Sequence, residues 1–248
     1  MKKLYVLVCL MLSACATTGQ QQNEVDSQQR HRAKIHTELG SGYYGQNLLE
    51  NALDEYKEAI QIDPGYALPY AGLGLVQATL NQDVDAESNF KHALHLDPQS
   101  SETHNNYGTF LCSRGRYDES VKEFLAAVKN PLYQTPELAY LNAGTCSAKK
   151  KDGKSAEQYF NTALQIQPNL RQASYQLASL YFGREDYFRA REYLQRAMLN
   201  DDPTPDMLWL GVRIERNLGG SDAESSYRNL LKNKYPNSAQ TKAMLSGE

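Results

Sequence analysis

The chain has 248 residues, a net charge of −3, and 41% apolar and 22% charged residues, which is the composition of an ordinary globular protein. Its 26 Lys and Arg residues are outnumbered by 29 Asp and Glu residues and are scattered among them, which argues against a nucleic-acid-binding protein. The run from Lys149 to Lys151 is the only basic cluster, and we interpret it as a solvated turn.

The first 14 residues have the pattern of a secretory signal peptide. Two lysines precede an apolar run from Leu4 to Leu12, which is far shorter than the roughly 20 apolar residues that a membrane-spanning helix needs. The stretch Leu12-Ser13-Ala14-Cys15 then resembles the lipobox of bacterial lipoproteins, in which the cysteine is acylated and becomes the new N-terminus. We therefore expect cleavage after Ala14 and lipidation of Cys15.

The residues after Cys15 predict how the chain is held at a membrane. Residue 16 is alanine rather than aspartate, which in bacterial lipoproteins favours sorting to the outer membrane. Two or more acyl chains anchor a protein stably, so Cys15 would hold the folded part on the periplasmic side without a spanning helix. Residues 15–32 are polar, with Val25 as their only large apolar residue, and we expect them to form a flexible tether.

From residue 33 onward, apolar and small residues recur with a period of 34 residues. The stretches EAIQIDP, HALHLDP and TALQIQP, which end at Pro64, Pro98 and Pro168, are three examples. Units begin near residues 33, 67, 101, 137, 171 and 204, and the pattern resembles the tetratricopeptide repeat. The resemblance implies an all-α fold, a right-handed superhelix of about six helix-turn-helix units over residues 33–248 with a C-terminal capping segment.

The spacing within each unit predicts which residues pack together. Positions 4, 7, 8 and 11 share one face of the first helix, and positions 20, 24 and 27 share one face of the second. We expect the small residue at position 8 to meet the small residue at position 20. The proline at position 32 is expected to end the second helix.

No motif in the array predicts catalysis. The stretch AKKKDGKS, from Ala148 to Ser155, matches a relaxed phosphate-loop pattern but lacks the first glycine and a preceding strand. His92 and His95 could share a metal ion, but no third ligand lies nearby in the sequence. We therefore expect no enzymatic activity, no catalytic residue, no metal, no cofactor and no small-molecule substrate.

Two cysteines remain after removal of the signal peptide and lipidation of Cys15. They are Cys112 and Cys146, at positions 12 and 10 of neighbouring units, where their side chains can face each other across adjacent first helices. An even pair in an oxidising compartment is a candidate disulfide. Two buried free thiols are the alternative.

The stretches around these cysteines carry a narrower resemblance. They read NNYGTFLCSRGRYDESVKEF from Asn105 and NPLYQTPELAYLNAGTCSAKKKD from Asn130. Together with the lipobox and the six units, they resemble the type IV pilus biogenesis lipoproteins of the PilW/PilF family. The resemblance implies a pilotin-like outer-membrane lipoprotein that helps the pilus secretin localise and multimerise.

Two other classes of function stay open from the sequence. Another outer-membrane repeat lipoprotein, such as an adaptor for cell-wall enzymes or a barrel-assembly subunit, would share the lipobox and the repeats, but is not expected to carry both cysteine-containing stretches. An enzyme is the remaining class, and nothing in the sequence favours it.

The first unit is the predicted partner-binding surface. Terminal repeats usually need a polar outer face or a cap, yet only the polar tether precedes this unit. We expect an uncovered apolar surface there to bind an extended or helical segment of the secretin. The alternative is that its side chains pack on neighbouring helices. The surface comprises Tyr43, Tyr44, Leu48, Tyr70 and Leu75.

Overall fold

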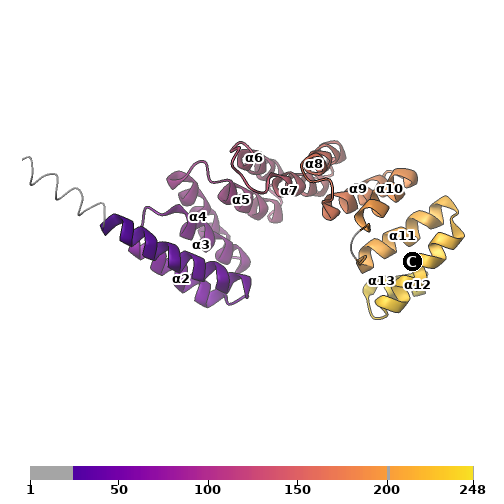
Figure 1. The fold of residues 1–248 in the computed structure, drawn as a ribbon, viewed down its shortest axis with the longest axis horizontal. Coiled ribbons are helices and arrows are strands. Elements are labelled where there is room, and N and C mark those ends of the chain that lie inside the picture. Colours follow the sequence, from indigo (N-terminus) through magenta and orange to yellow (C-terminus); the bar gives the residue numbers. More distant parts are fainter. Residues whose placement is uncertain (1–24, 200–201, 248) are drawn as a thin grey trace, which may run out of the picture. The chain divides into compact units, whose positions relative to one another are not determined.

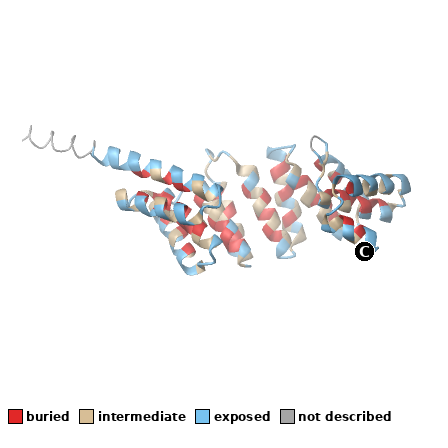
Figure 2. Cartoon of the chain, turned by 90° about the horizontal axis from the view of Figure 1, so that it is seen from below, coloured by how far each residue is buried: buried red, intermediate tan, exposed pale blue. Residues whose placement is uncertain are grey.

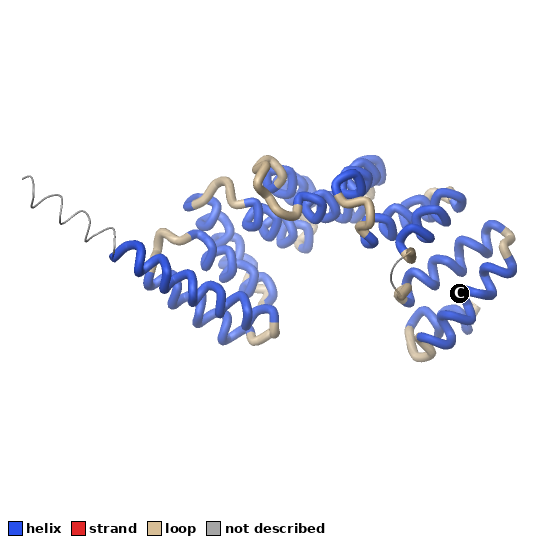
Figure 3. The backbone as a smooth tube through the Cα atoms, viewed as in Figure 1, coloured by secondary structure: helices blue, strands red, loops and turns tan. Residues whose placement is uncertain are grey.

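The computed structural model describes residues 25–199 and 202–247, and the regular secondary structure of these residues is all α-helical (Figures 1 and 3). The predicted all-α fold of paired helices is confirmed. A helix over residues 25–45 is followed by α2 (Leu49–Ile62), α3 (Ala67–Thr79), α4 (Asp83–Leu96), α5 (Ser101–Ser113), α6 (Tyr117–Ala127), α7 (Pro136–Lys149), α8 (Gly153–Ile166), α9 (Arg171–Gly183), α10 (Tyr187–Ala197), α11 (Pro205–Leu218), α12 (Ser221–Lys234) and α13 (Ala239–Ser246).

The chain divides into two compact units after Phe110, inside α5. In the first unit α3 packs on α2 and α4, and in the second α7 packs on α8, α9 on α10, and α11 on α12 and α13. The buried residues follow the helix faces that meet, and the exposed residues follow the outer faces (Figure 2). Within one hairpin, the two helices bury only the faces that they turn toward each other. Their other apolar faces are buried by packing on the neighbouring hairpins.

The recurrent Ile-Asp-Pro and Leu-Asp-Pro stretches end the second helices as predicted. Helix α2 ends at Ile62 and α4 at Leu96, two residues before a proline in each case. The aspartate between them accepts a hydrogen bond from a backbone N–H two residues on: Asp63 from Gly65 at 3.0 Å and Asp97 from Gln99 at 3.1 Å. The aspartate therefore fixes the turn that leads to the next hairpin.

The turn between the two helices of each hairpin contains one residue with a positive φ, between 58° and 76°. The second helix begins two residues after it in every hairpin. These residues lie 34 positions apart, except for a spacing of 36 between the third and the fourth, which matches the two extra residues between the units predicted to begin near residues 101 and 137. The left-handed turn residue therefore sets the register of each hairpin. The six residues are Asn47, Asn81, Gly115, Lys151, Glu185 and Gly219.

The small residue at position 8 receives the ring at position 24 of the second helix. A Cβ at Gly144 would lie only 2.6 Å from the ring of Phe160, and a Cβ at Gly74 would lie 3.1 Å from that of Phe90. Both rings are fully buried. A ring of this size fits between two helices only where the facing residue has no side chain.

The sixth hairpin keeps the predicted register in its first helix, where Leu210, Gly211 and Ile214 are buried, and departs from it near the end of its second helix. Helix α11 begins at Pro205, and Thr204 caps it by accepting a hydrogen bond from the Met207 N–H at 3.3 Å. A Cβ at Gly211 would lie 2.9 Å from the Tyr227 ring, so positions 8 and 24 of this unit meet as they do in other hairpins. Position 27 of this unit, Leu230, is 41% exposed, and the next residue, Leu231, is buried instead.

The predicted flexible tether is corrected over residues 25–32, which belong to the first described helix. Arg30 forms an ion pair with Asp63, and its guanidinium lies 4.8 Å from the centre of the Tyr66 ring. These contacts fix the start of the helix to the turn between α2 and α3. The rest of the predicted tether, the signal peptide and Cys15 lie outside the described residues.

The turn register gives a stability prediction. Gly115→Ala should lower the free energy of unfolding by about 1–2 kcal/mol, because Gly115 has φ of +76° and an alanine there is strained. Gly183→Ala is the matched control. A Cβ added at Gly115 or at Gly183 would have no atom within 4 Å, but Gly183, the last residue of α9, does not have a positive φ. Urea denaturation of both variants checks this, and equal midpoints would contradict it.

Candidate partner-binding surfaces

The described residues contain no group of three or more His, Cys, Asp or Glu side chains placed to hold a metal ion. His92 packs on Tyr70, with ring centres 4.3 Å apart, and lies 6.5 Å from the His95 ring. The relaxed phosphate-loop stretch forms the turn between α7 and α8, where Asp152 accepts a hydrogen bond from the Ser155 N–H. Among the described helices, none is long and apolar enough to cross a membrane.

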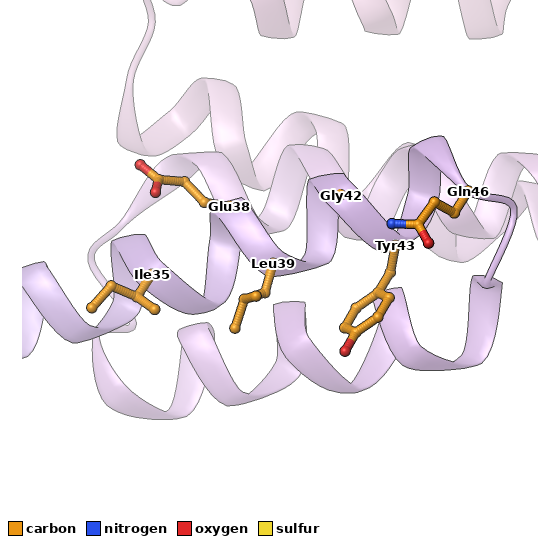
Figure 4. A pocket seen from close by; sticks show the side chains of 6 residues that line it. All are labelled: Ile35, Glu38, Leu39, Gly42, Tyr43 and Gln46. Carbon is orange, nitrogen blue, oxygen red and sulfur yellow. The ribbon is translucent and has the colours of Figure 1, made fainter.

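An open apolar hollow lies on the outer side of the first described helix. Ile35, Leu39 and Tyr43 follow one another along one side of this helix, and Ile35 and Leu39 remain 43% and 45% exposed (Figure 4). Large apolar side chains at this exposure on one helix face form a surface suited to a partner. The hollow, called here the N-terminal hollow, is lined by Ile35, Glu38, Leu39, Gly42, Tyr43 and Gln46.

The exposure of Leu39 follows from its position in the repeat. It occupies position 7, and the residue at position 7 of the next unit, Leu73, is only 6% exposed because it packs with Ala52 and Tyr56 of α2. No described residue before the first hairpin packs on Leu39 as α2 packs on Leu73. The apolar positions that normally contact a preceding unit are therefore left open.

The five predicted partner-binding residues lie in the first described helix, at the start of α2 and in α3. Of the five, only Tyr43 lines the N-terminal hollow. The Tyr44 hydroxyl lies 3.2 Å from the Thr79 hydroxyl, and the Tyr70 hydroxyl donates to the Pro64 carbonyl at 3.2 Å. Leu48 is 44% exposed at the start of α2, and Leu75 is half-buried in α3.

Sequence reasoning missed Ile35 and Leu39 as candidates. Ile35 is the third residue of the first unit, and Leu39 is at position 7, which the repeat pattern places on a packed helix face. Their signal is the spacing of four residues from Ile35 to Leu39 to Tyr43, which places all three on one helix face.

Cys112 and Cys146 are joined in a disulfide between α5 and α7. Their Cα atoms lie 5.8 Å apart, within the range of ordinary disulfides. The pair belongs to a small buried cluster with Phe124 and Ala143. It bridges the two-residue insertion, so it holds together the two hairpins whose spacing departs from 34 residues.

Pairs of charged side chains link the later hairpins. Glu157 of α8 accepts hydrogen bonds from the Tyr181 hydroxyl at 2.6 Å and from Arg184, which lowers the pKa of Glu157. Burial, and then the bond to Glu157, raises the pKa of Tyr181 to about 12. Arg191 of α10 pairs in the same way with Glu215 of α11, which is only 3% exposed. These contacts hold successive hairpins in place.

Comparison with known proteins identifies the family. Tetratricopeptide-repeat families match residues 34–81, 89–122 and 111–170. The chain is 29% identical over 238 residues to the type IV pilus assembly protein PilF of Pseudomonas aeruginosa, covering 96% of this chain and 94% of PilF. The crystal structure of PilW, a widely conserved type IV pilus biogenesis factor, is 31% identical, covers 86% of this chain and 98% of that one, and has a TM-score of 0.78. The chain belongs to the PilF/PilW family.

The match extends to other solved relatives of the same family. A structure of P. aeruginosa PilF has a TM-score of 0.78 and 27% identity over 89% of this chain and 99% of that one. The resemblance seen in the two cysteine-containing stretches is thus confirmed at the level of the family. The chain is a tetratricopeptide-repeat homologue of the type IV pilus assembly proteins PilF and PilW.

The disulfide gives a chemical prediction. Thiol labelling of the mature protein under denaturing, non-reducing conditions should find Cys112 and Cys146 unreactive, and both should label after reduction. Loss of the bridge in the double variant Cys112→Ala with Cys146→Ala should lower the free energy of unfolding by about 3–4 kcal/mol, since the bridge closes a loop of 34 residues. Labelling of both thiols before reduction would refute the pairing.

Proposed function

We propose that the chain is a lipid-anchored outer-membrane scaffold that helps a pilus secretin localise and multimerise. The observation that carries this proposal is the nearly full-length match to PilF and PilW, which are type IV pilus assembly proteins. The lipobox at Cys15 supports the anchor, and the repeat architecture supports a protein-binding role.

The N-terminal hollow is the surface that fits a secretin segment best. Its three apolar side chains lie along one helix face, which suits a partner with its own apolar side chains at helical spacing. Gly42 leaves room for the partner backbone to approach. Glu38 and Gln46 supply polar groups at the rim that can fix the orientation of a bound segment.

The position of this hollow also suits the task. It lies on the first described helix, whose described residues start ten positions after Cys15. An anchor at Cys15 would keep the hollow near the membrane into which a secretin must insert. A scaffold tethered at this end would bring bound secretin subunits together at one membrane surface, which raises their effective concentration.

The anchor is tested by one substitution. Cys15→Ser should prevent acylation and move the protein out of the outer-membrane fraction, because two or more acyl chains account for stable attachment. Membrane fractionation in cells without the secretin checks this result. Sedimentation of Cys15→Ser with the outer membrane under those conditions would disprove the anchor.

The hollow is tested by a pair of leucine and isoleucine changes. Ile35→Ser with Leu39→Ser should leave the melting temperature near that of the wild type, because both side chains are nearly half exposed. Heat-resistant secretin multimers and surface pili should fall about tenfold or more, as expected when two apolar anchors of an interface are removed.

The matched control replaces the same number of exposed apolar residues outside the hollow. Leu132→Ser with Leu199→Ser removes side chains that are 78% and 73% exposed, outside the hollow. It should assemble multimers at the wild-type level. Normal multimers in the Ile35 and Leu39 variant, or an equal loss in the control, would exclude the hollow as the specific site.

A further inference from the structure

A cluster of unpaired cations lies at the turn between α7 and α8. Several other cations of the second unit have a carboxylate partner: Lys150 pairs with Asp118, Arg189 with Asp186 and Lys234 with Asp202. Lys149, Lys151 and Lys154 are exposed, and none of them forms an ion pair with a described residue. Three such lysines within six positions form a local positive surface on a chain whose net charge is −3.

The charges of Lys151 and Lys154 do not stabilise the fold. Lys151 and Lys154 flank the start of α8, where the helix dipole disfavours positive charge, and only Asp152 is acidic there. Lys151 also occupies the left-handed turn position, with φ of +67°, which costs free energy for any residue but glycine. Asparagine or glycine fills that position in four of the six turns. Lysines at these places point to a role outside the folding of the chain.

The surroundings of the lysines suit a broad anionic surface better than a protein segment. Lys151, Lys154 and Arg184 border a shallow, open hollow between the α7–α8 and α9–α10 turns. Leu180 is the only large apolar side chain that lines it, and Arg184 donates to the Gly153 carbonyl at 2.6 Å. A protein interface usually centres on large apolar or aromatic anchors, and this hollow has no aromatic residue.

We infer that Lys149, Lys151 and Lys154 form a second membrane contact, which docks the edge of the array on anionic phospholipid head groups. The attraction is electrostatic, with an expected gain of about fivefold in binding per lysine near an anionic surface, and it falls off within roughly 8 Å at physiological salt. The choice of a membrane over an acidic protein rests on the proposed lipid anchor, which would hold the chain at a bilayer and make even a weak contact effective.

The test uses the mature protein purified from cell envelopes and mixed with vesicles of phosphatidylcholine alone or with about one third phosphatidylglycerol. Amine labelling with mass spectrometry reports each lysine. Lys149, Lys151 and Lys154 should label at least about threefold more slowly on anionic than on neutral vesicles. About 0.5 M NaCl should abolish the difference, because the Debye length then drops to roughly 4 Å. Lys122 and Lys232, which are exposed and without an ion pair among the described residues, should label equally on both.

A variant arm separates docking from nonspecific crowding at the vesicle. Amide hydrogen exchange of the α7–α8 turn should slow on anionic vesicles in the wild type. The effect should vanish in Lys149→Gln with Lys151→Gln and Lys154→Gln. It should persist in Lys122→Gln with Lys129→Gln and Lys232→Gln, which makes the same change of charge.

The outcomes distinguish this inference from the proposed function. Protein that floats with both kinds of vesicle but shows equal lysine labelling contradicts the membrane contact alone. Protein that floats with neither contradicts the membrane contact and the lipid anchor together. Lysines protected in intact cells but not on anionic vesicles would indicate an acidic protein instead of a membrane, and would overturn the inference.

Discussion

The structure depends on one packing arrangement, in which the ring of a residue in a second helix fits against a glycine of a first helix. Tyr56 contacts Gly40 of its own hairpin and Gly72 of the next, and Phe160 fills the space beside Gly144. Because the glycine has no side chain, the ring sets how closely the two helices approach. The same arrangement therefore fixes both the hairpin and its stacking on a neighbour.

This arrangement explains why the ends of the array differ. At the C-terminal end, α13 packs on α11 and α12, and Met244 is only 4% exposed in that contact. At the other end, the same kind of apolar position in the repeat leaves Leu39 open among the described residues. A surface that stacking would bury is thus available to another molecule. The proposed secretin site is thus formed by apolar residues at repeat positions that are buried in the following units.

The sequence predicted the hairpins well because their signals are local and repeated. Prolines after Ile62 and Leu96, and alanines and rings at fixed spacing, recur often enough to give five of the six registers. In the sixth, the predicted packing of Gly211 against Tyr227 holds, but the buried residue near the end of the second helix is Leu231 rather than Leu230. The sequence also failed for the helix over residues 25–32, whose polar sequence looks like a tether until Arg30 meets Asp63 and Tyr66.

The candidate site was harder to predict, because exposure depends on which units are present. Position 7 is buried in Leu73 and open in Leu39, although both are leucines in the same pattern. Tyr44 and Tyr70 are aromatic residues in the same region, yet their hydroxyls are bonded within the fold. Only the placement of neighbouring helices separates these cases.

The disulfide between α5 and α7 has a consequence for how such arrays evolve. Hairpins that follow one another at 34 residues can be duplicated or lost without disturbing the register of the rest. The bridge joins Cys112 to Cys146 directly across one junction, so a hairpin inserted there would part the two cysteines. Whole hairpins can therefore be added or lost before or after this junction without breaking the disulfide. A hairpin added at the junction itself would prevent the disulfide from forming.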